Sequence, residues 1–180
     1  YQIEYMLNNK KEIDNIAKRY KDVENIYILA KEPNVGSANE GALKLTETTQ
    51  KRVISGSSSE FMHGLFVSIK PEDLVIQIAT GNILNPTTKL AEQNLAEIIN
   101  KRQLKNAVLF KDFNNNEIST DLKNVKIIDV PVTNQYFTPL LNTVRLQQLT
   151  EAFTKELDIN PDNGGGVLTK YRKNLTMNKQ

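Results

Sequence analysis

Short apolar runs of strand length recur along this chain of 180 residues, and segments with helical periodicity separate them. The clearest runs are Asn25–Ala30, Leu74–Ala79, residues 107–110 and residues 125–130. A strand that is apolar on both faces is typical of a parallel sheet, because helices must then cover both sides of that sheet. The alternation therefore predicts an α/β protein, a three-layer α-β-α sandwich around a mostly parallel sheet.

The segments between these runs predict long helices over residues 3–20, 37–50, 88–101 and 136–157. Ser37 is the expected cap of the second helix, because it follows a segment that Pro33 and Gly36 break. Pro139 falls in the first turn of the last helix, where proline is tolerated. Residues 53–54 predict a short strand, and the polar run at residues 55–59 predicts a turn.

The size and composition of the chain predict one globular domain. With 180 residues, of which 39% are hydrophobic, the chain can build one core; we assign residues 1–160 to it and residues 161–180 to a polar tail. A net charge of +2 gives no reason to expect a nucleic-acid partner, and no apolar run is long enough to span a membrane. The absence of cysteine and the single histidine argue against a metal site, and no cofactor is expected. These features predict a soluble, cytoplasmic protein.

A cluster of charged side chains is the strongest candidate for chemistry. Glu40, Lys44 and Glu47 follow one another at i, i+4 and i+7, which places them along one face of a helix. The only histidine, His63, follows sixteen residues after Glu47. A glutamate beside a lysine, with a histidine nearby, can move protons on a small molecule that carries a carbonyl group. The same spacing also occurs on solvated, salt-bridged helix faces, which is the alternative interpretation.

Ligands of open parallel sheets bind at the carboxyl ends of the strands, where loops lead into helices. Three polar segments are expected at such ends, namely residues 34–38, 55–59 and 80–82. The first leads directly into the helix that carries the charged cluster. We therefore expect Ser37 and Thr80 to bind a ligand together with Glu40 and Lys44. The serine run at residues 55–59 has a helix cap as its alternative role.

Two motifs resemble a known family. The run Glu40-Gly41-Ala42-Leu43-Lys44-Leu45-Thr46-Glu47, followed by Glu60-Phe61-Met62-His63-Gly64, resembles the second half of tandem SIS-domain sugar-phosphate enzymes. These include the isomerase half of glucosamine-6-phosphate synthase and the amino-sugar-phosphate deaminases and deglycases. The order of elements agrees along essentially the whole chain. The resemblance implies an SIS-type, flavodoxin-like fold and a phosphorylated sugar or amino sugar as the ligand.

The same resemblance implies roles for individual residues. Glu47 matches the base that carries a proton between C1 and C2 through an enediol or enolamine intermediate, and His63 matches the residue that assists ring opening. Lys44 would stabilise charge beside the base, and Lys170 in the tail would close over the sugar. In the synthase the histidine crosses a subunit boundary. A homo-oligomer, at least a dimer, is therefore expected, together with an upstream SIS half.

The reaction class stays open between aldose-ketose isomerisation, deamination and deglycation. A different class of function is also open, in which the domain binds a sugar phosphate or pairs with a partner without chemistry. The segment Thr80-Gly81-Asn82 favours that alternative, because it occupies the position of the hydroxyl-rich phosphate loop but has little of that loop's hydroxyl-rich character. An upstream SIS half that carries such a loop would favour the enzyme.

Overall fold

A computed structural model describes residues 1–81, 86–113, 122 and 125–161 of the chain. Its elements follow in the order α1 (Gln2–Asn8), α2 (Lys11–Tyr20), β1 (Asn25–Ala30), α3 (Val35–Thr49), β2 (Arg52–Ser57), α4 (Ser58–Met62), η1 (Leu65–Ser68), β3 (Leu74–Ala79), α5 (Pro86–Arg102), β4 (Asn106–Asp112), β5 (Lys126–Val130) and α6 (Thr138–Glu156). Within these ranges, no helix is both long and apolar enough to cross a membrane.

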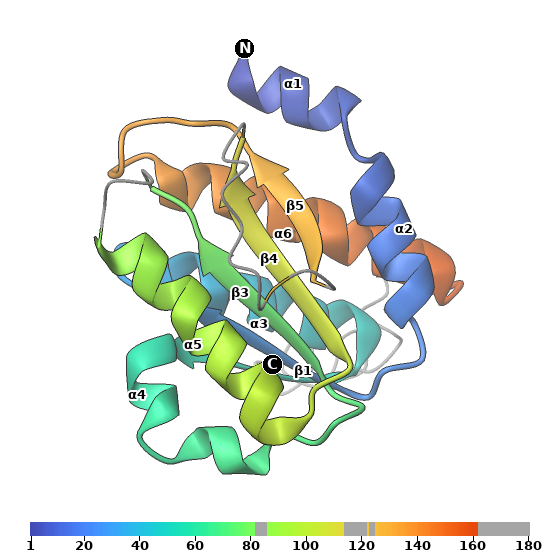
Figure 1. Cartoon of the computed structure of the whole chain (residues 1–180). Helices are drawn as coiled ribbons and strands as arrows, with labels where there is room; N and C mark the ends of the chain where they lie inside the picture. The colour runs from blue at the N-terminus through green and yellow to red at the C-terminus, as the bar shows by residue number, and fades with distance from the viewer. Residues whose placement is uncertain (82–85, 114–121, 123–124, 162–180) are drawn as a thin grey trace, which may run out of the picture.

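The five strands form one sheet in the order β2-β1-β3-β4-β5 (Figure 1). All four neighbouring pairs are parallel, so every strand ends at the same edge of the sheet. The strand order reverses between β1 and β3. In open α/β sheets a crevice commonly opens at such a switch point and receives the ligand. The parallel α/β prediction is confirmed.

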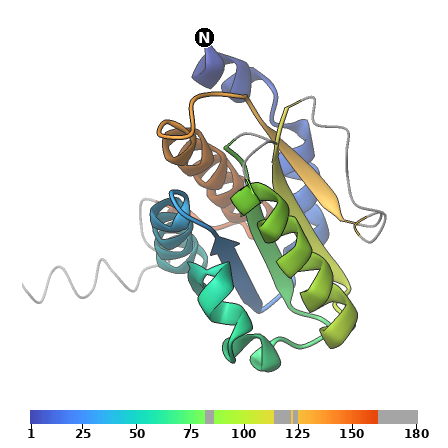
Figure 2. The same ribbon diagram turned by 60° about the vertical axis from the view of Figure 1, so that its left-hand side comes forward.

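Two apolar cores lie on opposite faces of this sheet, because successive strand residues point to opposite sides. In β1, Ile26 and Ile28 join the core under α2, α3 and α6. Tyr27 and Leu29 join the core under α4 and α5. Figures 1 and 2 show these two helix layers with the sheet between them. The three-layer α-β-α sandwich is therefore confirmed.

Helices α3 and α6 approach each other closely at Gly41. A Cβ atom added to Gly41 would lie 2.7 Å from Cδ1 and 3.0 Å from Cβ of Leu146, which is fully buried on α6. Any larger side chain at this point would push the two helices apart. The absence of a side chain at Gly41 therefore allows α3 to pack closely against α6.

The single helix predicted for residues 3–20 is wrong, since the segment forms α1 and α2. The buried guanidinium of Arg145 donates from Nη1 to the carbonyl oxygens of Met6 and Asn9, over 3.2 and 3.0 Å. Asn9 also donates from Nδ2 to the carbonyl of Tyr5, over 2.8 Å. These contacts satisfy the carbonyls at the end of α1 and stop the helix at this point.

Two local predictions around α3 and β2 are also wrong. Asn34, not Ser37, is the N-cap residue of α3, and the Ser37 hydroxyl instead donates to the carbonyl of Pro139 over 2.7 Å. Residues 55–57 are not a turn but the second half of β2, where Ser57 pairs with Ala30. An edge strand tolerates polar, half-exposed side chains, so its sequence resembles that of a turn. Pro139 lies in the first turn of α6, as predicted.

Candidate functional site

The outer face of α3 carries the charged cluster that the spacing predicts. The ammonium Nζ of Lys44 lies 3.0 Å from Oε2 of Glu47 and 3.9 Å from Oε1 of Glu40. The side chains of Lys44, Glu40 and Glu47 are 40%, 42% and 34% exposed, respectively. A carboxylate therefore lies beside a cation on a surface that a second molecule can reach.

The inner face of the same helix is fully packed. Ala38 and Leu45 belong to the core between the sheet and α6, and Gly41 contacts Leu146. The charged face is thus carried by a rigid element and not by a loop. Leu43 lies on the outer side and is 49% exposed, so the charged cluster has an apolar neighbour.

The direction of α3 separates Glu47 from the loop at its start. Asn34 caps α3 at the carboxyl edge of the sheet, and Glu47 lies in the last turn of the helix. Thirteen residues of helix span about 20 Å, at roughly 1.5 Å per residue. Residues 34–38 and Glu47 therefore do not meet within the chain.

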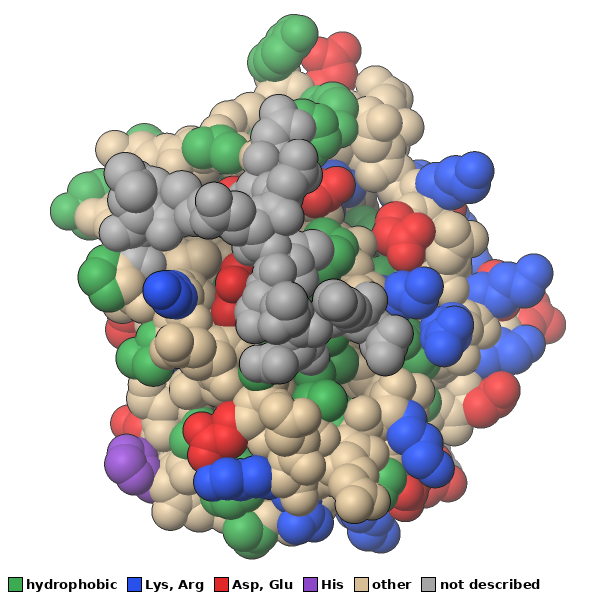
Figure 3. Space-filling model, in the orientation of Figure 1, with side chains coloured by type: hydrophobic (Ala, Val, Ile, Leu, Met, Phe, Trp, Pro, Cys, Tyr) green, Lys and Arg blue, Asp and Glu red, His purple; other side chains and the backbone are tan. Residues whose placement is uncertain are grey.

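His63 lies on the other side of the sheet from Glu47. It follows α4, is exposed, and its backbone N–H donates to the carbonyl of Glu60 over 3.0 Å. Figure 3 shows the histidine in purple at the surface. Because α3 and α4 pack on opposite faces, the sheet lies between the two residues. The chain by itself does not bring the predicted base and the predicted histidine together.

A buried polar network fills the switch point between β1 and β3. Asn34 donates from Nδ2 to the carbonyl of Thr80 over 3.1 Å. Asn142 donates from Nδ2 to Oδ1 of Asn34 over 3.0 Å and to Oγ1 of Thr80 over 2.7 Å. Thr138 also donates to Oδ1 of Asn34, over 3.1 Å. The four side chains are at most 5% exposed, so they occupy the place where a ligand would lie in a related sheet.

This network was missed by the sequence interpretation, although Asn34 and Thr80 were noted as loop residues. Their partners Thr138 and Asn142 come from α6, more than fifty residues later, and no local pattern points to them. The hydroxyls of Ser37 and Thr80, which were expected to bind a ligand, are both buried and both bonded within the protein. Asn142 keeps one buried oxygen, Oδ1, without a hydrogen-bond partner among the described residues.

Lys31 is a further polar residue at the carboxyl edge of the sheet that the sequence interpretation did not single out. It directly follows β1, and its ammonium donates to Oγ of Ser59 at the start of α4. Partial burial lowers the pKa of Lys31 below its ordinary value. The signal in the sequence was a lysine placed directly after a buried strand. Lys170, predicted to close over the sugar, lies outside the described residues.

Comparison with known proteins assigns the family. Residues 19–147 match the family model described as the SIS domain. The chain belongs to the SIS domain family. Among curated proteins, this SIS domain is 25% identical over 160 residues to the glutamine–fructose-6-phosphate aminotransferase (isomerizing) of Aquifex aeolicus. It is 29% identical over 148 residues to the enzyme of the same name from Escherichia coli.

The match covers most of this chain but a small part of these relatives. The alignments include 89% and 82% of this SIS domain, but only 26% and 23% of the two aminotransferases. The chain thus spans about a quarter of the length of the curated relatives that it matches.

Solved structures agree with this family assignment at the level of the fold. The C-terminal domain of glucosamine-fructose-6-phosphate aminotransferase from Francisella tularensis superposes with a TM-score of 0.76 at 21% identity. That match covers 88% of this chain and 43% of the other. Tagatose-6-phosphate ketose/aldose isomerase from Escherichia coli gives a TM-score of 0.67 at 20% identity, over 87% and 42% of the two chains. The resemblance to the SIS family is confirmed.

Proposed function

We propose that this SIS domain is the catalytic half of a phosphosugar enzyme, either an aldose-ketose isomerase or an amino-sugar-phosphate deaminase or deglycase. The observation that supports this most directly is the Glu47–Lys44 pair, 3.0 Å apart on an accessible face of α3. The pair lies on a fold shared with proteins named as isomerizing aminotransferases and ketose/aldose isomerases. Glu47 is the proposed base.

The proposed chemistry is a proton transfer between adjacent carbons of an open-chain sugar phosphate. The Glu47 carboxylate removes the proton from C2 of the aldose, and the electrons of that C–H bond form the C1–C2 double bond of an enediol. The carbonyl oxygen gains negative charge in this step, which the Lys44 ammonium stabilises. The C1 oxygen then gains a proton and the C2 hydroxyl gives one up. Glu47 returns its proton to C1, so that C2 becomes the carbonyl of the ketose and the base is restored. If the enzyme is a deaminase or a deglycase, the same proton transfer passes through an enolamine intermediate.

The proposed site needs a second SIS unit. Asn34, Thr80 and Asn142 occupy the switch point, so the phosphate has no place there and must be held by groups from elsewhere. His63 lies across the sheet from Glu47, and it too must reach the sugar from another unit. We infer that this unit is a second copy of the chain or an upstream SIS half. Lys170 remains the proposed lid residue.

Solvent deuterium exchange tests the proposed proton transfer. Fructose 6-phosphate and glucosamine 6-phosphate are incubated in D₂O with the protein, and proton NMR follows deuterium entering C1 or C2. We expect exchange with the wild-type chain and a loss of about a thousandfold or more with Glu47→Gln, which removes the base but keeps the shape of the side chain. Glu97→Gln is the matched control, because Glu97 pairs with Lys101 on α5, on the opposite face. Equal exchange by wild type and Glu47→Gln contradicts the assignment of the base.

Mixing two inactive variants tests whether His63 acts across a subunit boundary. Glu47→Gln and His63→Ala are purified separately, mixed in equal amounts and allowed to exchange subunits. In a twofold dimer with shared sites, half of the dimers are mixed and each keeps one intact site, so about a quarter of the wild-type rate should return. No recovery in demonstrably mixed dimers contradicts a site that two copies of the chain share.

The second candidate function is a binding or pairing module without chemistry. The filled switch point favours it, because the described side chains at that point already bond to one another. Under this alternative, sugar phosphate protects the protein against thermal unfolding while no deuterium enters C1 or C2. The enzyme hypothesis predicts both protection against thermal unfolding and deuterium exchange into the sugar phosphate.

A further inference from the structure

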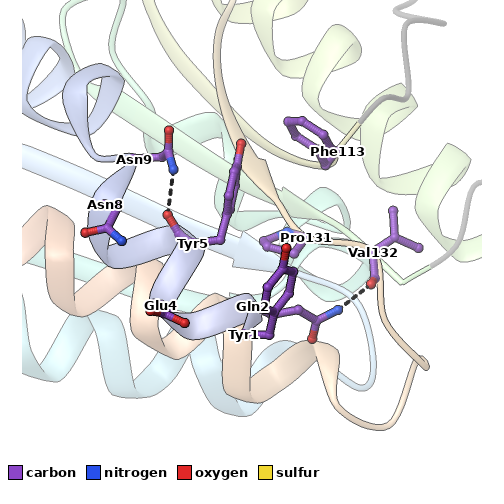
Figure 4. A pocket seen from close by; sticks show the side chains of 9 residues that line it. All are labelled: Tyr1, Gln2, Glu4, Tyr5, Asn8, Asn9, Phe113, Pro131 and Val132. Carbon is purple, nitrogen blue, oxygen red and sulfur yellow. Dashed lines mark hydrogen bonds between the residues drawn. The ribbon is translucent and has the colours of Figure 1, made fainter.

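A hollow of about 530 Å³ lies between α1 and the chain segments that leave β4 and β5. Nine residues line it: Tyr1, Gln2, Glu4, Tyr5, Asn8, Asn9, Phe113, Pro131 and Val132 (Figure 4). Its volume falls within the range of roughly 300 to 1,000 Å³ that is common for small-molecule sites. The sheet order places β5 at the opposite edge from β2, so the hollow is separate from the charged face of α3.

Aromatic rings form one wall of this hollow. Tyr5 and Phe113 meet edge to face, with ring centroids 5.7 Å apart and an angle of 70°. They remain 37% and 38% exposed, and Val132 opposite them is 55% exposed. A ligand that covers large apolar side chains of this kind binds more tightly, because it removes their apolar surface from water.

The polar side chains of the hollow include a carboxylate and several amide oxygens, which accept hydrogen bonds. Gln2 donates from Nε2 to the carbonyl of Val132 over 2.7 Å, and Asn9 donates from Nδ2 to the carbonyl of Tyr5 over 2.8 Å. Each of those bonds uses one N–H of the amide group and leaves the amide oxygen of that side chain. Glu4 adds a carboxylate, and none of the nine lining residues is lysine or arginine.

The structure beneath the hollow fixes its shape. Arg145 is 3% exposed, and its guanidinium donates to the carbonyls of Met6, Asn9 and Asp129. Nη1 also donates to Oε1 of Gln148, so the guanidinium connects the end of α1 to β5 and α6. Gln148 also binds the end of α1, because its Nε2 donates to the carbonyl of Met6 over 2.9 Å. These bonds fasten α1 in place, so the wall that carries Tyr5 is preformed.

We propose that this hollow binds a small molecule that joins an aromatic or apolar ring to an amine. The ring packs between Tyr5, Phe113 and Val132, and the ammonium lies near Glu4 and the amide oxygens. A cation is also attracted by the faces of aromatic rings. A phosphate is disfavoured, because the lining carries the Glu4 carboxylate and none of its nine residues is lysine or arginine. The ligand of this hollow is thus of a different class from the sugar phosphate proposed for α3.

Binding of three matched probes to the full native polypeptide tests this proposal. Tyramine carries the ring and the amine, 4-ethylphenol carries the ring alone, and 3-(4-hydroxyphenyl)propionate carries the ring and a carboxylate. Affinities come from calorimetry, and the location comes from NMR shifts of the backbone amides of Tyr5, Phe113 and Val132. We expect tyramine to bind about tenfold more tightly than the propionate, with 4-ethylphenol between them.

Variants separate the contributions of ring and charge. Glu4→Gln should lower tyramine affinity about threefold to tenfold while leaving 4-ethylphenol unchanged. Val132→Arg keeps the backbone carbonyl that Gln2 uses, fills the hollow with positive charge and should abolish tyramine binding. Tyr136→Ser removes a 76% exposed aromatic ring outside the nine lining residues and should change nothing. Absence of amide shifts at the hollow, or a propionate affinity equal to that of tyramine, overturns the proposal.

Discussion

Replacing Gly41 with alanine tests the close contact that positions the charged helix. The added Cβ would lie 2.7 Å from Cδ1, 3.0 Å from Cβ and 3.1 Å from Cδ2 of Leu146. Carbon atoms in favourable contact are about 3.5 to 4.0 Å apart, so each of these approaches is repulsive. The two Cδ atoms can move by rotation of the leucine side chain. The Cβ atom cannot, because the backbone of α6 fixes it.

Two effects of opposite sign set the magnitude. Alanine favours a helix interior over glycine by about 1 kcal/mol. Overpacking a well-filled core costs about 1 to 3 kcal/mol. Because Leu146 is fully buried and its Cβ is immobile, we expect overpacking to outweigh the helix propensity, with a net loss of up to about 2 kcal/mol in the free energy of unfolding.

A double-mutant cycle measured by urea unfolding isolates the contact. Leu146→Ala alone should lower the free energy of unfolding by about 2 to 5 kcal/mol. In that background both Cδ atoms are absent and only the 3.0 Å approach to Cβ remains, so Gly41→Ala should cost clearly less than it does in the wild type. Gly36→Ala is the control, because Gly36 also lies in α3 but has no atom within 4 Å of an added Cβ. If Gly41→Ala stabilises the wild type as Gly36→Ala does, the close-contact reasoning is refuted.

Three further substitutions test two buried hydrogen-bond networks and one surface ion pair. Arg145→Met removes the guanidinium that binds the carbonyls at the end of α1, and should lower the free energy of unfolding by about 3 kcal/mol and speed hydrogen exchange across residues 6–9. Asn142→Ala leaves the switch-point network without two donated bonds, and should cost about 1 to 3 kcal/mol in thermal or urea unfolding. At Glu151, the hydrogen bond from Lys155, with support from Lys10, holds the carboxyl pKa below its ordinary value of 4.5. A lowered carboxyl pKa stabilises the fold above pH 4.5 and loses this effect as the pH falls through the folded-state pKa, so Glu151→Gln should cost about 0.5 kcal/mol at pH 7 and nothing in strong acid.

The order of helices and strands could be predicted because each buried strand has a strong local signal. In β3 all six residues are buried, and the apolar run Leu74–Ala79 alone indicates a central parallel strand. The break between α1 and α2 could not be predicted, because its cause is Arg145, far along the chain. The full length of β2 could not be predicted for a different reason. Its half-exposed edge position permits serine and glycine, which also signal turns.

The candidate site was predictable only where it depends on one helix. The alignment of Glu40, Lys44 and Glu47 follows from the helical repeat and needs no tertiary information. The closure of the switch point could not be foreseen, since Asn34 gains its partners Thr138 and Asn142 from α6. The hollow beside Tyr5 likewise depends on Phe113, more than a hundred residues away.

The packing of α3 links the stability of this domain to its proposed chemistry. The buried side of the helix is set against α6 by Gly41, and the opposite side carries Glu47 within 3.0 Å of Lys44. If the phosphate and His63 come from a second SIS unit, the base must reach a substrate that other residues hold, and its position along the surface then decides the rate. A larger residue at Gly41 shifts α3 outward by a few tenths of an ångström without touching any proposed ligand group. Gly41→Ala should therefore lower kcat for deuterium exchange more than it raises KM, even under conditions where the variant is fully folded, whereas a purely structural role for Gly41 would leave both constants unchanged in the folded protein.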